Sequence, residues 1–266
     1  MVFFITKYYD VHVFPNIQII NGNIDIEQAL KNIPTCTVDD RTRQRALLYT
    51  LQQWSYFAQQ YHIQYWITRG ALVGYVQRRG LIPFDLNIDI LIMAQHTAQL
   101  DQLSKLNFSS VYQLKVHPQW FLAESEKRSY FESEDINFLA PNARFINRND
   151  DVYINIWPIY DHHPAQKRIA KHNEPILTQY ETNDQWKSLP RTWIFPLYRC
   201  FFSGIMVWCP KEAENFVIHM YSDIAANLSS IQCINSSWKQ SDHHELLNER
   251  TTTNNEENSS EQEITT

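Results

Sequence analysis

Glycine is scarce in this 266-residue chain, and three of its five glycines lie within eleven consecutive positions, 70 to 80. The segment GALVGYVQRRG is followed by LIPFDLNIDI, which places polar side chains at alternate positions, Asp85, Asn87 and Asp89. A strand that enters a glycine-containing turn and a helix can bring backbone N–H groups close to a phosphate group. Side chains at alternate positions of a strand point to one face. The segment therefore predicts a phosphate-cradling turn opposite a polar strand face.

Carboxylates on such a strand face suit a hard divalent cation that also bridges to phosphate oxygens. Asp85 and Asp89 are the candidate ligands, for Mg²⁺ or Mn²⁺, whereas Asn87 offers a carbonyl oxygen without a charge. The alternative is an ordinary turn between two strands, with both aspartates as solvated edge residues. Because short glycine motifs also arise by chance, the pattern alone leaves both interpretations open.

The charge distribution argues against nucleic-acid binding. Residues 245–266 carry six acidic side chains and one arginine, which accounts for −5 of the net charge of −6. The other 244 residues therefore carry about −1 and lack the excess of basic residues that nucleic-acid recognition requires. No apolar run is long enough to predict a transmembrane segment, and the N-terminal residues do not have the pattern of a signal peptide.

The four cysteines lack the spacing of a metal site. Cys200 and Cys209 flank a predicted hairpin and could form a disulfide in an oxidising compartment, but two buried thiols fit the sequence equally well. Glycosylation sequons are compatible with secretion and also occur by chance in asparagine-rich chains. They begin at Asn107, Asn227, Asn235 and Asn258.

Hydrophobic periodicity predicts an α+β fold, a mixed and mostly antiparallel sheet flanked by helices. We expect an extension with short strands over 1–40, one domain over 41–238 and a disordered acidic tail over 239–266. Residues 161–190 have a loop-like composition. The clearest predicted elements are helices over 42–61 and 210–221, strands over 65–68, 86–93 and 152–159, and a hairpin within 192–209 that turns at Ser203-Gly204.

Four separated blocks, which together span about residues 45–223, resemble the LicD/fukutin family. The first is the helix and strand before Ile67, and the second is ITRGALVG followed by GLIPFDLNIDI. The third is VYINIWPI, and the last is IFPLYRCFFSGIMVWCPKEAENFVIHMYSD. The resemblance implies the nucleotidyltransferase fold seen in polymerase-β-like enzymes. It also implies transfer of phosphocholine, ribitol phosphate or a related group from a CDP-activated donor to a glycan or glycoprotein.

The resemblance also assigns roles to residues. Gly70, Ala71 and Gly74 would frame the donor-phosphate turn, with Arg78 and Arg79 as basic neighbours. The metal-facing catalytic positions would be Asp85, Asn87 and Asp89, together with Asn155 on a later strand. Animal members of the family usually work in the Golgi behind an N-terminal anchor. No anchor is evident here, so a cytoplasmic location is also compatible with the sequence.

The chain departs from the family pattern at four positions, all in the polar site. Ala71 replaces a serine or threonine, Gln77 a basic residue, and Asn87 and Asn155 two acids. The framework positions show no such departure. Two hypotheses follow: a metal-dependent phosphotransferase, or a catalytically weakened or inactive member that acts as a binding or scaffolding protein. A third possibility is that Asp150 or Asp151 supplies a relocated acid.

Other chemistry-bearing residues favour ordinary structural roles. The paired histidines lack a third metal ligand at a suitable spacing. The tryptophans are expected mainly in the core and the further basic residues on a solvated face. These residues are His162-His163 and His243-His244; Trp54, Trp66, Trp157, Trp193 and Trp208; and Lys167 and Arg168.

Overall fold

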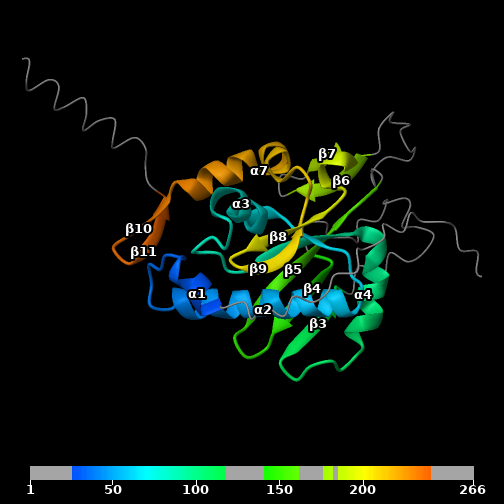
Figure 1. The fold of residues 1–266 in the computed structure, drawn as a ribbon, viewed down its shortest axis with the longest axis horizontal. Coiled ribbons are helices and arrows are strands. Elements are labelled where there is room, and N and C mark those ends of the chain that lie inside the picture. Colours follow the sequence, from blue (N-terminus) through cyan, green and yellow to red (C-terminus); the bar gives the residue numbers. More distant parts are fainter. Residues whose placement is uncertain (1–25, 118–140, 162–175, 182–184, 241–266) are drawn as a thin grey trace, which may run out of the picture.

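The computed structural model describes residues 26–117, 141–161, 176–181 and 185–240, and Figure 1 shows their arrangement. The helices are α1 (Ile26–Lys31), α2 (Asp40–Gln60), α3 (Arg69–Arg78), the 3-10 helix η1 (Ala94–His96), α4 (Thr97–Ser104), α6 (Arg191–Ile194) and α7 (Ala213–Ser229). The strands are β1 (Trp66–Ile67), β2 (Ile88–Met93), β3 (Tyr112–Val116), β4 (Ala143–Asn147), β5 (Val152–Ile159), β6 (Ile176–Glu181), β7 (Gln185–Pro190), β8 (Tyr198–Phe202), β9 (Ile205–Cys209), β10 (Ile231–Ile234) and β11 (Ser237–Gln240).

A five-stranded sheet in the order β1-β2-β5-β4-β3 organises the fold. Only β2 and β5 run parallel, whereas the other three pairs of neighbouring strands are antiparallel. The described residues also form three two-stranded hairpins, β6–β7, β8–β9 and β10–β11. This arrangement confirms the predicted mixed, mostly antiparallel sheet flanked by helices.

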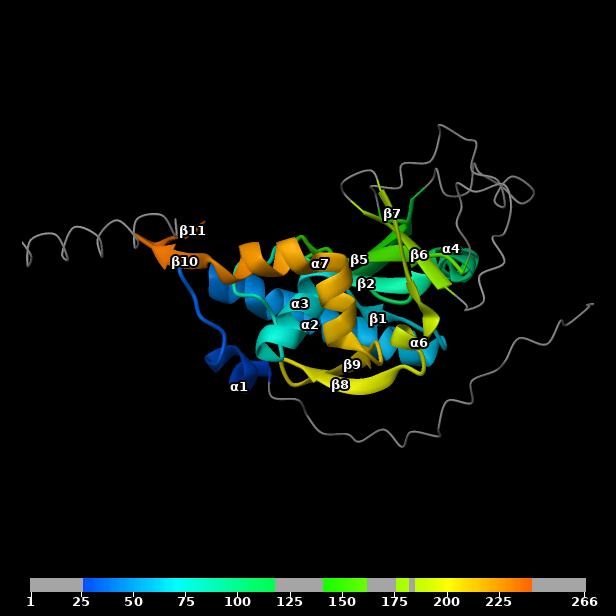
Figure 2. The same cartoon turned by 90° about the horizontal axis from the view of Figure 1, so that it is seen from above.

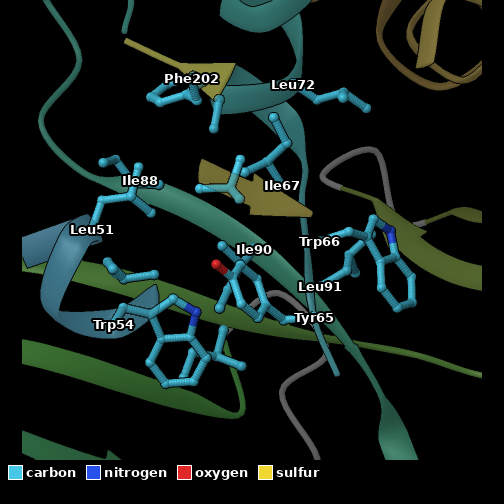
Figure 3. Packing of buried hydrophobic residues seen from close by; sticks show 14 of the residues in the cluster. Leu51, Trp54, Tyr65, Trp66, Ile67, Leu72, Ile88, Ile90, Leu91 and Phe202 are labelled. Atoms are coloured by element: carbon cyan, nitrogen blue, oxygen red, sulfur yellow. The ribbon is translucent and has the colours of Figure 1, made fainter. Parts of the chain in front are cut away.

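The core lies between α2, the sheet and the β8–β9 hairpin. Leu51 and Trp54 project from α2 and are fully buried, as are Ile90 and Leu91 of β2 (Figure 3). The Trp54 ring contacts Phe145 of β4 edge-on, with 5.5 Å between ring centroids. Each apolar side chain of this size stabilises the fold by about 1.5–3 kcal/mol when fully buried. Trp54 and Trp66 thus have the core role predicted for them.

Two glycines of the opening segment serve packing rather than a turn. A Cβ on Gly74, in the middle of α3, would lie 2.4 Å from the backbone oxygen of Gly80. A Cβ on Gly80 would lie 2.2 Å from Ser203 Oγ in the β8–β9 turn. The concentration of glycine therefore lets the segment after α3 approach both the helix and this hairpin closely.

Several sequence predictions are confirmed and others need correction. α2 and β5 match their predicted segments closely, because their periodicity is long and regular. By contrast, α1 lies within the predicted N-terminal stretch of short strands, and β6 and β7 form a hairpin in the loop-like region. The side chains of Leu177 and Leu189 are buried and attach this hairpin to the rest of the fold. The hairpin is therefore stabilised by tertiary packing, which cannot be predicted from the composition of residues 161–190. Residues 1–25 and 241–266 lie outside the described residues.

Two disulfides pair all four cysteines. The pairing of Cys200 with Cys209 on neighbouring strands was one of the two alternatives left open by the sequence. Cys36 and Cys233 join the segment before α2 to β10 across 197 positions of sequence. No spacing rule predicts this second bond, because connectivity cannot be derived from cysteine positions alone.

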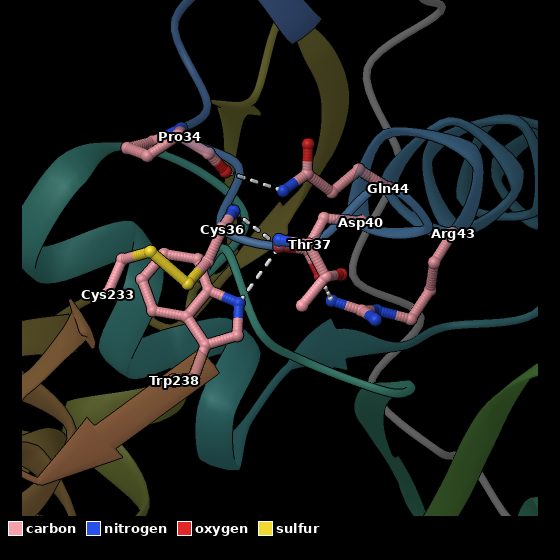
Figure 4. The surroundings of a disulfide bond; sticks show 8 residues. All are labelled: Pro34, Cys36, Thr37, Asp40, Arg43, Gln44, Cys233 and Trp238. Carbon is pink, nitrogen blue, oxygen red and sulfur yellow. Dashed lines mark hydrogen bonds and ion pairs between the residues drawn. A yellow bond between two sulfur atoms is a disulfide. The ribbon is translucent and has the colours of Figure 1, made fainter. Parts of the chain in front are cut away.

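Next to the second disulfide, Asp40 forms a buried hydrogen-bond centre at the start of α2 (Figure 4). Its carboxylate accepts hydrogen bonds from the backbone N–H of Cys36 at 2.6 Å and of Thr37 at 2.9 Å. Trp238 Nε1 of β11 donates at 3.0 Å and Arg43 Nη2 at 2.6 Å. Burial opposes the negative charge, but these hydrogen bonds together hold the pKa of Asp40 well below its ordinary value.

Candidate functional site

The parallel register of β2 and β5 sets the centre of the site, because it pairs Asp89 directly with Asn155. Asn155 Nδ2 donates a hydrogen bond to Asp89 Oδ1 at 3.0 Å. Trp157, two residues further along β5 and therefore on the same face, donates from Nε1 to the same oxygen at 2.8 Å. One oxygen of the Asp89 carboxylate thus has two donors from β5.

Asp85 reaches this centre by a different route from the one predicted. β2 begins only at Ile88, so Asp85 is not part of the strand. A turn in which Asp85 N–H donates to Ile82 O, followed by a bend at 86–87, brings the carboxylate back toward Asp89. The predicted single strand face from 85 to 89 is therefore wrong, although the two carboxylates do come together. Asn87, partly exposed, lies in the bend between them.

The start of α3 lies against the Asp85 carboxylate. A Cβ on Gly70 would be 3.3 Å from Asp85 Oδ2, so glycine keeps the helix backbone close to this carboxylate. Thr68, the residue before the helix, makes no side-chain cap, and the first N–H groups of a helix have no partner within it. This end of α3 therefore places backbone N–H groups next to a carboxylate.

The two carboxylates are electrostatically unfavourable neighbours when ionised. Burial and then the charge of Asp89 raise the pKa of Asp85 to about 8, against a smaller opposing effect of Arg43. Burial also raises the pKa of Asp89, and hydrogen bonds from Trp157 and Asn155, with the charge of Arg69, oppose that shift. Each raised pKa favours the protonated carboxyl, and a cation beside the pair would relieve the same repulsion.

Three arginines frame the carboxylates. Arg69, the first residue of α3, places its guanidinium 4.0 Å from the centroid of the Trp157 ring. Arg144 of β4 donates from Nε to Asn155 Oδ1 at 3.1 Å. Arg43 of α2 donates from Nε to the backbone oxygen of Asp85 at 3.0 Å and thereby holds the loop that carries this aspartate. The sequence reasoning identified none of these arginines.

Arg43 also connects the site to the hydrogen-bond centre at Asp40. Its Nη2 donates both to Asp40 Oδ1 at 2.6 Å and to Pro83 O at 3.2 Å. Gln44 Nε2 donates to the same Pro83 oxygen at 3.0 Å. The loop that leads to Asp85 is therefore held from α2, whose own start is fixed beside the Cys36–Cys233 disulfide.

Some predicted site residues lie elsewhere. Gly74 is inside α3, and Arg78 and Arg79 are at its C-terminal end, eight or more residues, about 12 Å along the axis, from Gly70. Arg78 and Arg79 therefore lie apart from Gly70, and their predicted role beside the donor phosphates stays a prediction. Ala71 does lie in the first turn of α3, but it is only 2 % exposed and packs in the core.

The candidates for a relocated acid lie away from this centre. Asp150 and Asp151 occupy the turn before β5, and Asp151 is four residues, about 13 Å, from Asn155 along the strand. Asp150 instead accepts a hydrogen bond from Asn147 Nδ2. Within the described segments, no group of three or more histidine, cysteine or acidic side chains is placed to hold a metal. The paired histidines, Lys167 and Arg168 lie outside those segments.

Trp157 is the tryptophan whose predicted core role needs qualification. It is partly buried, and its indole N–H contacts the site directly. The alternation of side chains along β5 could have predicted this contact, because position 157 shares a face of the strand with position 155. No sequence pattern predicts that Arg43 holds the loop before Asp85. That contact depends on how α2 packs beside residues about forty positions further along the chain.

Residues 62–212 match the sequence model of a family described as LicD/FKTN/FKRP, nucleotidyltransferase domain. The matched region includes both carboxylates, Asn155 and Trp157, but neither Asp40 nor Arg43. A comparison with curated proteins finds no match for the chain. Among the residues that the structure describes, no helix is both long and apolar enough to cross a lipid bilayer.

Proposed function

Because the chain belongs to the LicD/FKTN/FKRP family, we propose that it is a phosphotransferase that moves a phospho-alcohol or phospho-sugar from a CDP-type donor to a glycan or glycoprotein. The observation that carries the proposal is the convergence of Asp85 and Asp89 beside Gly70 at the start of α3. These groups come from three separate local structures. Their convergence is what a site for a cation and a phosphate requires.

Within this site, Asp85 and Asp89 would hold Mg²⁺ or Mn²⁺. A divalent cation there would neutralise charge on the donor phosphates and on the group being transferred. The backbone N–H groups at the start of α3 would bind phosphate oxygens, and Gly70 leaves room for their approach. Arg69, stacked on Trp157, would place a further positive charge beside the donor. Catalysis would then consist mainly of positioning and charge stabilisation.

One observation favours the second candidate, a weakened or inactive member that binds ligands or partners. Asn155 already has a partner for each end of its amide, because Nδ2 donates to Asp89 and Oδ1 accepts from Arg144. An aspartate at this position would instead add a third carboxylate and increase the need for a cation. The asparagine therefore stabilises the site in the absence of metal, at the cost of metal affinity.

Calorimetric titration of the full chain with CDP-choline and CDP-ribitol, with and without Mg²⁺ or Mn²⁺, tests the proposal. We expect donor binding that requires the cation. The reversion Asn155→Asp is expected to strengthen cation-dependent binding about tenfold or more, because one more carboxylate joins the site. Absence of cation-dependent binding in folded wild-type protein and in the reversion variant would support the binding or scaffolding function instead.

We further propose that the chain matures in the secretory pathway. The support is that both disulfides require an oxidising compartment to persist. Three sequon asparagines are also exposed, Asn107, Asn227 and Asn235, whereas Asn258 lies outside the described residues. When the chain is expressed behind a cleavable signal sequence in a eukaryotic host, we expect a mobility shift on endoglycosidase treatment. The shift should decrease with each Asn→Gln substitution, and a secreted, folded protein without any shift would contradict this prediction.

A further inference from the structure

A cavity lies at the end of α3 that is remote from the carboxylates. It has a volume of about 480 Å³, within the usual range for small-molecule sites. Gln28 of α1 and Asn32, the residue after this helix, line one side, Arg78 and Arg79 another, and the turn at Ser203 closes it. Figure 2 shows α1, α3 and β8; the turn that closes the cavity directly follows β8. None of the residues that form the carboxylate site lines this cavity.

The wall between α3 and the β8–β9 turn is held by specific contacts. The N–H of Leu81 donates to Ser203 Oγ at 2.9 Å, and the N–H of Ser203 donates to Arg79 O at 3.0 Å. Gly80 permits this close approach. Arg79 itself adopts a left-handed conformation with φ of 60° and ends the helix. The cavity is therefore pre-formed, which lowers the entropic cost of binding a ligand.

The cavity is positively charged although the chain as a whole carries a net charge of −6. Among the described residues that line it, Arg78 and Arg79 are the charged ones, and no carboxylate accompanies them. The Arg79 guanidinium lies 4.8 Å from the centroid of the Tyr75 ring, and Arg78 Nη2 lies 3.5 Å from Asn32 O, at the limit for a hydrogen bond. Both residues are exposed to solvent.

The negative end of α3 does not cancel this charge fully. The carbonyl oxygens of Gly74 and Tyr75, near the end of the helix, accept hydrogen bonds from the N–H groups of Gly80 and Arg79. Guanidinium groups present paired N–H donors that match the oxygens of a phosphate. The amides of Gln28 and Asn32 are suited to hydroxyl groups, and the volume accommodates a sugar ring.

We propose that this cavity binds a phosphate monoester on a small polyhydroxy compound such as a phosphorylated hexose. Arg78 and Arg79 would bind the phosphate, and the amides of Gln28 and Asn32 would contact the hydroxyl groups. The proposal does not depend on the phosphotransferase function, because the two sites share no residue. The pair of arginines predicted to accompany the donor phosphates thus acquires a binding role of its own.

Titration of the full-length protein with glucose 6-phosphate in the presence of EDTA tests this proposal without involving the metal site. We expect saturable binding, with weaker binding of inorganic phosphate and none of glucose. Arg78→Gln should weaken binding severalfold, and the double variant Arg78→Gln/Arg79→Gln about tenfold or more. Arg78→Gln leaves the left-handed residue 79 unchanged, so it gives a result even where the double variant is unstable.

Arg148→Gln is the matched control, because it removes the same charge from the exposed turn before β5. It should leave binding unchanged, as should Asp89→Ala, so a failure of the phosphotransferase proposal remains distinguishable from a failure of this one. No binding to wild-type protein would overturn the inference, and so would equal binding of glucuronate. Equal weakening by Arg148→Gln would also overturn it, since the attraction would then be nonspecific.

Discussion

Replacement of Asp89 by alanine is expected to abolish cation-dependent donor binding and to reduce any donor turnover by a factor on the order of 10³ or more. Asp89 is the carboxylate that the β2–β5 register places at the centre of the site. Without it, Asp85 would be the remaining carboxylate at a centre where the family pattern has several acids. Calorimetry with Mg²⁺ and CDP-choline, followed by a donor hydrolysis assay, measures the two effects.

The control for this variant is Asp89→Asn. It keeps an oxygen that can accept the hydrogen bond from Trp157 Nε1, removes the charge and replaces the other carboxylate oxygen with an NH2 group. Asp89→Asn should therefore lose metal binding as fully as Asp89→Ala while it retains more of the wild-type thermal stability. Unchanged turnover in a folded Asp89→Ala protein would show that the chemistry, if present, lies elsewhere. Asp101→Ala removes a partly exposed carboxylate that pairs with Lys105 away from the site, and it should have no effect.

The parts of the fold that the sequence predicted well are those fixed by local periodicity. The stripe of Leu47, Leu51, Trp54 and Ala58 identifies α2, because the spacing repeats over about three turns of a helix. The alternation from Val152 to Ile159 identifies β5. The β6–β7 hairpin has no comparable signal, because its polar residues acquire a buried side only through tertiary contacts.

The candidate site was predictable in composition but not in geometry. The spacing of Asp85 and Asp89 suggested that they share a face, and they do approach each other, yet a turn rather than a continuous strand brings Asp85 there. The pairing of Asp89 with Asn155 depends on the register of two strands more than sixty residues apart. In the sequence, only the family resemblance indicates that positions 89 and 155 belong to one site, because the pairing of distant strands is a tertiary property.

The support behind the site was not predictable at all. Arg43, Asp40 and the Cys36–Cys233 disulfide form a connected series from the N-terminal segment to the backbone of Asp85. An aspartate at the start of a helix is so common that its position indicates no more than a favourable interaction with the helix dipole. Its partners show the larger role, and they lie as far away as Trp238.

Replacement of Asp40 by alanine is accordingly expected to reduce the free energy of unfolding by ~3–5 kcal/mol. The Asp40 side chain is 1 % exposed, and its removal leaves the backbone N–H groups of Cys36 and Thr37 without this acceptor and Arg43 without its carboxylate partner. Denaturant unfolding at pH 7 under non-reducing conditions measures the loss. A change below about 1 kcal/mol would contradict the role assigned to this carboxylate.

The variant Asp40→Asn and the pH dependence of stability separate the charge from the hydrogen bonds. Asparagine retains one acceptor oxygen, so its loss at pH 7 should be smaller, about 1–2 kcal/mol. Because folding lowers the pKa of Asp40, its ionised form stabilises the protein fully above the unfolded-state value of about 3.9, and this contribution is lost as the pH falls toward the lower folded-state value. The stability difference between wild type and Asp40→Asn should therefore be constant from pH 7 to 5 and shrink below pH 4. A difference that stays constant down to pH 3 would show that hydrogen-bond geometry, and not the charge of Asp40, holds α2 beside the disulfide.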